Sequence, residues 1–256
     1  MSKRNTQQRR RMIIEQLNSS GEVKVDELAR QLQTSEVTIR KDLSELESNG
    51  LLLRRYGGAV PLPSELLLGD NEPEVSNRKI EIAKAAAQLI KDHHRLIIDS
   101  GTTTAALLPQ LSDKQGLVVM TNSLNIASAL RELENEPVLL MTGGTWDPHS
   151  EAFQGKVAEQ VLKSYDFDQL FIGTDGIDVE RGTTTFNELF GLSQVMADVS
   201  RDVIVMAESS KVGRKMHNVE LPWAKISILV TDHLLADSDK KAIEAHGVQV
   251  IRAPKQ

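Results

Sequence analysis

The polar side chains between positions 35 and 48 could together hydrogen-bond to a nucleic acid, because helical spacing places them on one face. Ser35 is a preferred residue at a helix N-terminus, and Ile39, Leu43 and Leu46 then recur at the spacing of one buried stripe. Donors and a small apolar group that project from the opposite face can recognise base edges in the major groove. The sequence therefore predicts a DNA recognition helix at residues 35–48. The side chains expected to contact DNA from this helix are Val37, Thr38, Arg40, Lys41 and Ser44.

The segments before the recognition helix complete a helix-turn-helix pattern. Residues 25–32 carry Leu28 and Leu32 four positions apart, which is typical of a short helix with one buried side. Residues 33–34 then provide a tight turn into the recognition helix. Residues 8–17 predict one more helix, which is expected to support this pair.

Basic residues flank the helix-turn-helix pattern on both sides. Arg10 and Arg11 belong to a cationic run near the N-terminus that could contact DNA phosphates. Residues 51–60 predict two short strands around a turn, with Arg54 and Arg55 on them. A helix-turn-helix followed by such a hairpin is a winged helix. We therefore expect a winged helix-turn-helix DNA-binding domain.

Short helix pairs with exposed basic residues also occur in proteins that do not bind DNA, and this is the alternative to a DNA-binding helix-turn-helix. The charge distribution along the chain helps to decide between the two. Residues 1–60 contain 11 Lys and Arg against 8 Asp and Glu, a net charge of +3, whereas the rest of the chain contains 19 against 28, a net charge of −9. The predicted DNA reader is thus basic within a chain whose total net charge is −6. This asymmetry favours binding to phosphate.

Two short motifs carry a family resemblance. The run 38–43, Thr-Ile-Arg-Lys-Asp-Leu, followed by 55–59, Arg-Tyr-Gly-Gly-Ala, is similar to the signature of DeoR-type bacterial transcriptional repressors, and the similarity covers nearly all 256 residues. The resemblance implies an N-terminal winged helix that binds operators. It also implies a C-terminal domain that resembles ribose-phosphate and glucosamine-phosphate isomerases and senses a phosphorylated sugar. Within the family the chain looks most like regulators of sugar-alcohol or amino-sugar metabolism.

Length and composition predict two domains joined by a linker. A chain of 256 residues with 40% hydrophobic content exceeds one typical domain and can bury a sizeable core. Residues 61–76 contain three prolines, one glycine and the pair Asp70-Asn71, a composition that disfavours regular elements. We therefore expect the DNA-binding domain at residues 1–60, a linker at 61–76 and the sugar-phosphate sensor domain at 77–256.

The sensor domain is expected to have an α/β fold with a mainly parallel sheet, because strand and helix patterns alternate along it. Apolar runs such as 118–120 and 204–206 are typical of strands covered on both faces, which favours parallel pairing with helices on either side. In such sheets ligands bind beyond the carboxyl ends of the strands. Strands are expected at residues 95–99, 117–121, 138–142, 169–173, 203–207, 226–231 and 248–252.

Polar turns follow the first three of these strands. The run 99–104, Asp-Ser-Gly-Thr-Thr-Thr, lies between a strand and a helix, where glycine permits close backbone approach and hydroxyl groups can donate to a phosphate. Simple helix capping by its first residues is the alternative for an isolated motif. Similar turns after the next two strands favour one shared effector site. Its expected residues in these turns are Asp99, Ser100, Gly101, Thr102, Thr103, Asn122, Gly143 and Gly144.

Carboxylates and one lysine follow later strands. Asp175, Asp178 and Lys211 could bind sugar hydroxyls and phosphate, or move protons in an aldose–ketose isomerisation. The resemblance puts them where the related isomerases keep polar active-site groups, which supports their assignment to effector binding. Loop capping by the aspartates and a solvated lysine are the alternatives.

One position departs from the family pattern. DeoR-type sensors commonly carry Arg two residues after the equivalent of Gly-Gly-Thr at 143–145, whereas this chain has Asp147. An acidic side chain there could meet an ammonium group, which favours an amino-sugar phosphate. The following Pro148 makes an ordinary turn the alternative.

The resulting hypothesis is a DNA-binding repressor of a sugar or amino-sugar operon, released from double-stranded operator DNA by a phosphorylated sugar. The alternative is a sugar-phosphate isomerase with an accessory N-terminal domain. We expect no catalytic residues, no cofactor and no metal, since the six histidines lack ligand spacing and cysteine is absent. The lack of cysteine and of long apolar runs predicts a cytoplasmic protein that does not contact membranes. A homo-oligomer, either a dimer or a tetramer, is expected because one winged helix contacts little DNA.

Overall fold

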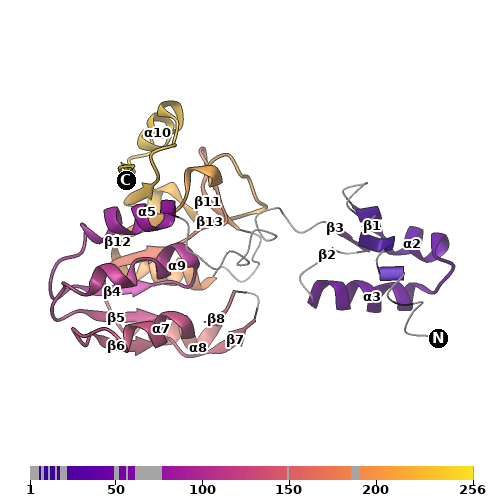
Figure 1. Ribbon diagram of the computed structural model, residues 1–256, viewed down its shortest axis with the longest axis horizontal. Coiled ribbons are helices and arrows are strands. Elements are labelled where there is room, and N and C mark those ends of the chain that lie inside the picture. The colour runs from indigo at the N-terminus through magenta and orange to yellow at the C-terminus, as the bar shows by residue number, and fades with distance from the viewer. Residues whose placement is uncertain are drawn as a thin grey trace. The chain divides into compact units, whose positions relative to one another are not determined.

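The computed structural model divides the chain into two compact units, Met1–Pro73 and Glu74–Gln256 (Figure 1). We call them the DNA-binding unit and the sensor unit. The structure describes residues 6, 9–10, 12–14, 16–17, 22–48, 52–55, 57–60, 77–148, 150–185 and 191–255.

The DNA-binding unit has the expected helix-turn-helix followed by a hairpin. Its three strands form an antiparallel sheet in the order β1-β3-β2. A core that includes Ile13, Leu28, Ile39 and Leu43 holds the helices together, and each of these residues is buried. Described residues between positions 6 and 17 are helical, as expected. The named elements are β1 Val23–Lys24, α2 Val25–Gln31, α3 Glu36–Ser48, β2 Leu53–Arg55 and β3 Gly58–Val60.

The turn between α2 and α3 is closed by backbone hydrogen bonds. Gln33 adopts a left-handed φ of 47°, which lets the amide of Thr34 donate to the carbonyl of Ala29 at 3.0 Å. Ser35 then caps α3, since its Oγ accepts a 3.2 Å bond from the amide of Thr38. The predicted N-cap is confirmed.

The wing depends on a glycine where two strands come very close. A Cβ on Gly58 would lie 2.1 Å from the carbonyl oxygen of Val23 in β1, so only glycine fits. Gly57, at the turn between β2 and β3, has a φ of +79°. This part of the expected Gly-Gly motif therefore has a backbone role in building the wing.

The sensor unit contains a seven-stranded sheet in the order β15-β14-β12-β9-β4-β5-β6. Every neighbouring pair of these strands is parallel. The predicted parallel sheet is confirmed, and each expected strand is present with shifts at its ends. The strands are β4 Arg95–Ile98, β5 Val118–Thr121, β6 Val138–Met141, β9 Phe167–Ile172, β12 Ser200–Met206, β14 Ile228–Thr231 and β15 Gln249–Arg252.

Helices cover both faces of this sheet, and each face has its own core. Alternate strand residues separate the two cores: Leu96 and Ile98 of β4 face one, and Ile97 faces the other. Residues of α5, α7 and the segment around α6 and η1 pack on the first face, and residues of α8, α9 and α10 on the second. These helices are α5 Asn77–Ala87, α6 Thr102–Ala105, η1 Leu108–Leu111, α7 Leu124–Leu130, α8 Lys156–Leu162, α9 Gly191–Asp198 and α10 Asp237–Glu244.

The strand order reverses between β4 and β9. From β4 the chain adds β5 and β6 on one side, whereas β9 is followed by β12, β14 and β15 on the other. Such a reversal is the usual place for a ligand beyond the carboxyl ends of a parallel sheet. The loops after β4 and β9 are therefore neighbours at the expected site.

Two smaller sheets were not expected from the sequence. Strands β10 Gly176–Asp178, β11 Gly182–Thr185 and β13 Asn218–Pro222 form an antiparallel sheet, and β7 Thr145–Asp147 pairs with β8 Ala152–Gln154. The four residues of β11 are all buried. β-Branched threonines fit a pleated strand when their hydroxyl groups are hydrogen-bonded.

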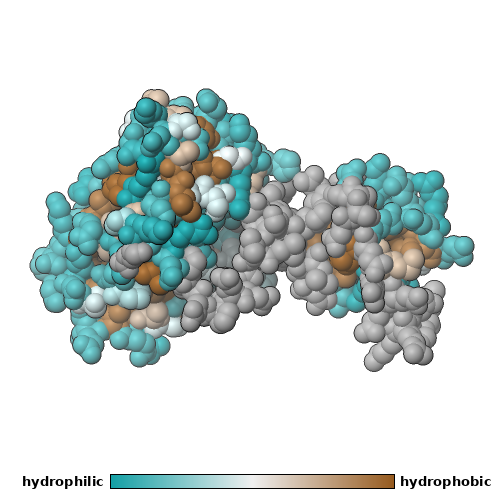
Figure 2. Space-filling model, turned by 45° about the horizontal axis from the view of Figure 1, so that its top comes forward, coloured by the Kyte–Doolittle hydropathy of each residue, from teal (hydrophilic) through white to brown (hydrophobic). Residues whose placement is uncertain are grey.

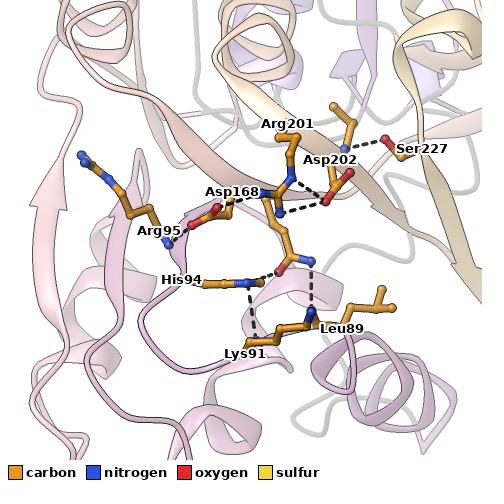
Figure 3. A network of polar contacts seen from close by, with 10 residues as sticks. Leu89, Lys91, His94, Arg95, Asp168, Arg201, Asp202 and Ser227 are labelled. Atoms are coloured by element: carbon orange, nitrogen blue, oxygen red, sulfur yellow. Dashed lines mark hydrogen bonds and ion pairs between the residues drawn. The ribbon is translucent and has the colours of Figure 1, made fainter.

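The opposite, amino-terminal ends of the strands are joined by a polar network (Figure 3). Asp168 accepts bonds from the amide of Arg95 at 2.8 Å and from Nη1 of Arg201 at 3.2 Å. Gln169 contacts His94 at 3.2 Å and donates to the carbonyl of Leu89 at 3.0 Å. This network links β4, β9 and β12 at the edge away from the candidate ligand site.

The described surface is largely polar on the face that Figure 2 shows, where hydrophobic residues appear only in patches. Among the described helices, none is long and apolar enough to cross a membrane.

Candidate DNA-binding and effector sites

The exposed face of α3 carries the predicted DNA contacts. Val37 is 74% exposed, and Lys41 and Ser44 are also exposed, while Ile39 and Leu43 are buried on the other side. The predicted division of this helix into a buried and an exposed face is thus confirmed. The residues on the exposed face are available to a groove of DNA.

Two predicted contacts already have partners within the helix. Thr38 is half-buried, and its hydroxyl lies 2.9 Å from that of Ser35. Arg40 donates from Nη2 to Glu36 at 2.8 Å, and both of these side chains are well exposed. An exposed pair of this kind contributes little to stability, so Arg40 can exchange Glu36 for a phosphate or base at small cost.

Asp42 has a structural role that the sequence interpretation missed. It is 2% exposed and accepts bonds from Nε of Arg9 at 2.5 Å and from Nε of Arg10 at 3.0 Å. Arg10, expected to contact phosphate, therefore ties the first helical segment to α3. The sequence signal for these ion pairs was the acidic residue directly before Leu43, which belongs to the buried stripe of the helix. The expected contact Arg11 lies outside the described residues.

The predicted wing contacts Arg54 and Arg55 both lie in β2. This strand pairs with β3 across the turn at Gly57. Their expected position on the wing is confirmed.

The loop after β4 is a tight turn between a strand and a helix. Gly101 has a φ of +142°, which disfavours any other residue. The hydroxyl of Thr104 closes the loop by donating to the carbonyls of Asp99 at 2.7 Å and Gly101 at 2.9 Å. Neither Asp99 nor Ser100 caps α6 with its side chain, because Gly101 occupies that position. The helix-capping alternative is therefore wrong.

The loops after β4 and β5 meet through Asn122. Its Nδ2 donates to Oδ1 of Asp99 at 2.8 Å, and its Oδ1 accepts from the amide of Ser100 at 3.0 Å. Burial raises the pKa of Asp99 to about 6, although hydrogen bonds to its carboxylate from the side chain of Asn122 and from the backbone of Ser100 lower it and the nearby charge of Asp175 raises it further. The structure thus brings these two predicted turns together.

Asp175 and Lys211 lie on the other side of the strand reversal. Lys211 donates from Nζ to the carbonyl of Thr174 at 2.5 Å, and Asp175 accepts from the hydroxyl of Thr185 at 2.7 Å. Burial lowers the pKa of the Lys211 ammonium, and the charge of Asp175 opposes that effect. Lys211 is therefore a positioned, partly buried cation rather than a solvated one.

Sequence reasoning missed a cation and a carboxylate near these loops. Lys79, in the first turn of α5, donates from Nζ to the hydroxyl of Thr102 at 2.8 Å. Glu220 in β13 accepts from the hydroxyl of Ser193 at 2.8 Å. Burial raises the pKa of Glu220 to about 8, the bond from Ser193 lowers it, and the charges of Asp99 and Asp175 add to the increase. We call Lys79, Asp99, Thr102, Asp175, Lys211 and Glu220 the strand-end cluster.

Asp178 is better assigned to a hairpin than to the strand-end cluster. It is 2% exposed and accepts from Nε of Arg181 at 2.6 Å and from the amide of Glu180 at 3.0 Å, with Lys215 at 3.6 Å. These contacts keep its pKa below the usual value despite its burial. We therefore correct its predicted role: it stabilises the turn between β10 and β11.

The glycines after β6 also have a structural explanation. A Cβ on Gly144, whose φ is +113°, would lie 2.4 Å from the carbonyl oxygen of Gln154. Gly143 has a φ of +60° and open space around it. The amide of Phe153 donates to the carbonyl of Asn122 at 2.8 Å, so the hairpin that follows these glycines touches the loop after β5.

Asp147 caps its own turn. Its Oδ2 accepts from the hydroxyl of Ser150 at 2.7 Å and from Nε2 of Gln154 at 3.1 Å. The alternative reading as an ordinary turn is favoured, and the hypothesis that Asp147 meets an ammonium group is withdrawn. Within the described ranges no group of three or more His, Cys, Asp and Glu residues could hold a metal ion.

Comparison with known proteins identifies both units. The DeoR-like helix-turn-helix domain matches residues 9–65, and the DeoR C terminal sensor domain matches residues 74–233. The Escherichia coli O157:H7 protein named "Putative aga operon transcriptional repressor" is 38% identical over 254 residues, which cover 96% of this chain and 93% of that protein.

Other relatives also match along nearly their whole length. The HTH-type transcriptional regulator GlpR of Haloferax volcanii is 34% identical, over 95% of this chain and 96% of that protein. The transcriptional repressor AccR of Agrobacterium fabrum is 32% identical, over 89% and 90%. Among solved structures, ribose 5-phosphate isomerase A of Methanocaldococcus jannaschii is similar to 54% of this chain and 55% of that one, with 17% identity and a TM-score of 0.39.

Proposed function

Because this chain belongs to the DeoR family of transcriptional regulators, we propose that it represses a sugar or amino-sugar operon and is released from operator DNA by a phosphorylated sugar. The proposal assigns the two steps to different units. The DNA-binding unit recognises the operator, and the strand-end cluster binds the effector.

The exposed face of α3 supports the assignment of DNA recognition. Val37, Lys41 and Ser44 project from it, and Arg40 makes an exposed pair with Glu36. In this assignment α3 enters the major groove and the wing contacts the backbone. Arg10 contributes indirectly, because it fixes the position of α3 through Asp42.

The main support for the proposed effector site is that Lys79, Thr102 and Lys211 lie close together at the strand reversal. A phosphate carries about −1.5 to −2 charges at pH 7, and charge-assisted bonds from ammonium groups bind it strongly. Asp99 and Asp175 lie close enough to influence each other and can accept hydrogen bonds from sugar hydroxyls. The cluster thus offers cations for the phosphate and carboxylates for the sugar.

We propose binding without turnover, so the isomerase alternative is not favoured. The relatives that match along nearly the full chain are named as transcriptional regulators and repressors. Tenfold relief of repression needs a difference of only about 1.4 kcal/mol in effector affinity between two conformations. One phosphate-binding site can supply such a difference.

The experiment combines operator binding with a panel of hexose 6-phosphates, hexosamine 6-phosphates and pentose 5-phosphates. The wild type should lose operator affinity with at least one of these compounds. Lys211→Ala, and Thr102→Val with Thr103→Val, should still bind operator but lose this response. Aldose–ketose interconversion at enzymatic rates, stopped by the same substitutions, would instead establish the isomerase.

We also propose that the protein acts as at least a dimer, with two α3 helices on two half-sites. The edge strand β6 supports this, because its sequence is Val-Leu-Leu-Met and Val138 is 56% exposed. In the described part of the chain β6 pairs only with β5. An apolar edge strand is a ready template for pairing with a second copy.

A further inference from the structure

The first turn of α5 contacts two of the loops that surround the strand-end cluster. Lys79 donates to Thr102, in the loop after β4, at 2.8 Å. Its neighbour Arg78 pairs through Nε with Oε1 of Glu208, in the loop after β12, at 3.1 Å. Glu208 immediately precedes η2, Ser209–Lys211, which ends in the lysine of the cluster. One helical turn is thus bonded to both loops.

The body of α5 is fixed more firmly than this turn. Ile82, Ala83 and Ala86 are completely buried against the sheet, whereas Arg78 and Lys79 are only partly buried. The helix packs along β12, β14 and β15. A change at the cluster therefore acts on the first turn, while the buried residues hold the remainder in place.

The first turn of α5 also lies next to the segment that connects the two units. Asn77 begins the first helix after residues 61–76, which connect the sensor unit to the DNA-binding unit. Anything that moves the first turn of α5 also moves the end of that connection. Lys79 and Lys211 are separated by 132 positions in sequence, yet the charge of Lys79 lowers the pKa of Lys211.

The repulsion between the two ammonium groups suggests that an anion could bind both of them. Each lysine now donates to a neutral oxygen: the hydroxyl of Thr102 for Lys79, and the carbonyl of Thr174 for Lys211. A phosphate dianion is a stronger acceptor than either oxygen and relieves the repulsion when it binds both cations. Binding would therefore draw Lys79, and the turn that carries it, toward the effector.

We propose that Lys79 is a phosphate-binding residue of the effector site and that the first turn of α5 transmits effector binding to the DNA-binding unit, with Arg78 and Glu208 positioning that turn. This inference rests on the proposed function. A ligand shifts an equilibrium only if it binds two states differently. Exchange of the Lys79–Thr102 bond for a Lys79–phosphate bond provides that difference.

The first test measures effector affinity by calorimetry on the full-length protein, with the tightest-binding sugar phosphate from the panel above. Lys79→Met should raise the Kd at least tenfold, and Lys79→Arg should recover most of the loss because the charge returns. Lys156→Met is the matched control, since Lys156 also lies in the first turn of a helix but is exposed on α8. Its Kd should stay within twofold of the wild type.

The second test measures transmission, as the ratio of operator Kd with and without saturating effector. Arg78→Met and Glu208→Gln should each bring this ratio at least threefold closer to one, while effector still binds. An unchanged ratio in both variants would overturn the role of the α5 turn. Normal effector affinity in Lys79→Met together with lost affinity in Lys211→Ala would overturn the role of Lys79 and leave the proposed function intact. Absence of binding by any sugar phosphate to the wild type would overturn both.

Discussion

Asn122 donates a 2.8 Å hydrogen bond from Nδ2 to Oδ1 of Asp99, and these two residues follow neighbouring strands β5 and β4. The same amide group accepts from the backbone of Ser100, so one buried side chain fixes both the carboxylate and the loop. The loop after β4 therefore depends on a residue that lies more than 20 positions further along the chain.

The first prediction concerns this bond. Asn122→Leu should lower the free energy of unfolding by about 1–3 kcal/mol, because it removes the buried side chain that bonds to both the carboxylate of Asp99 and the amide of Ser100. The pKa of Asp99 should rise above its value of about 6, since the bond from Asn122 lowers it. Denaturant unfolding and carboxyl-carbon NMR titration measure the two effects. Asn125→Leu removes a 3.3 Å exposed contact and serves as control; equal stability of the two variants would contradict the prediction.

The second prediction concerns the pH dependence that Glu220 creates. Its pKa rises from 4.5 to about 8 on folding, mainly through burial. The folded protein therefore retains a proton that the unfolded chain releases, and stability falls as pH rises through this window, by up to about 1.4 kcal/mol per pH unit. Glu220→Gln cannot ionise, so its stability relative to the wild type should increase from pH 5 to pH 8 and then level off.

Urea unfolding of both proteins at several pH values between 5 and 9 measures this difference. The exposed Glu180 provides a control, since Glu180→Gln should follow the wild-type profile. Parallel profiles for wild type and Glu220→Gln would mean that Glu220 does not titrate in this window.

The positions of Asp99 and Glu220 in the chain explain why sequence reasoning found one and missed the other. Asp99 directly follows an apolar strand, and ligands of parallel sheets bind beyond such ends. Glu220 lies inside the short strand β13, whose sequence Asn-Val-Glu-Leu-Pro has no strong strand pattern. Lys79 lies in an amphipathic helix, where a lysine normally faces solvent. Only the tertiary contact with Thr102 reveals its position.

The same distinction holds for the fold. The central strands were predictable because apolar runs such as that of β5 are covered on both faces. The start of β12 was missed because Ser200 and Arg201 are polar, and their place in the sheet depends on pairing with β9 and the network around Asp168. Strand β11 was missed because the hydroxyl partners of its buried threonines, such as the carbonyl of Arg214, come from distant segments.

The third prediction tests the buried ion pairs of the DNA-binding unit. Asp42→Ala should destabilise this unit by about 3 kcal/mol, because it leaves Arg9 and Arg10 without their shared carboxylate. Hydrogen exchange should accelerate in α3 while the sensor unit stays unchanged. Glu45→Ala removes an exposed carboxylate 4.0 Å from Arg10 and should have a smaller effect. Equal exchange in the two variants would show that Asp42 is not needed for stability.

The fourth prediction separates base recognition from phosphate contact on α3. Lys41→Ala should weaken operator binding by about 1–3 kcal/mol and relax sequence preference if Lys41 contacts a base, whereas a phosphate contact would weaken all DNA equally and lower the salt slope by about one unit. Arg40→Ala is tested in the same way. Lys24→Ala, which removes an exposed lysine on β1, is the control. Unchanged affinity and salt dependence in both α3 variants would reject the recognition helix.

The last prediction tests the association of two copies through β6. The two edges of the large sheet differ: β15 carries Arg252, which pairs with Asp237 at 2.7 Å, whereas all four residues of β6 are apolar. Natural proteins protect edge strands with charges, so an uncharged edge is the better candidate for an interface. A two-fold axis beside β6 would let each copy present the same strand to the other.

Val138→Lys should therefore convert a wild-type dimer to monomer in sedimentation velocity and weaken operator binding at the same time. Val138 is 56% exposed, so a lysine there is compatible with folding of the single chain. Gln249→Lys places the same charge on the opposite edge and should leave the dimer intact. A wild type that is monomeric both free and on operator DNA would refute dimerisation itself. A dimer that survives Val138→Lys would move the interface away from β6, because a lysine buried in a paired apolar edge cannot keep its charge solvated.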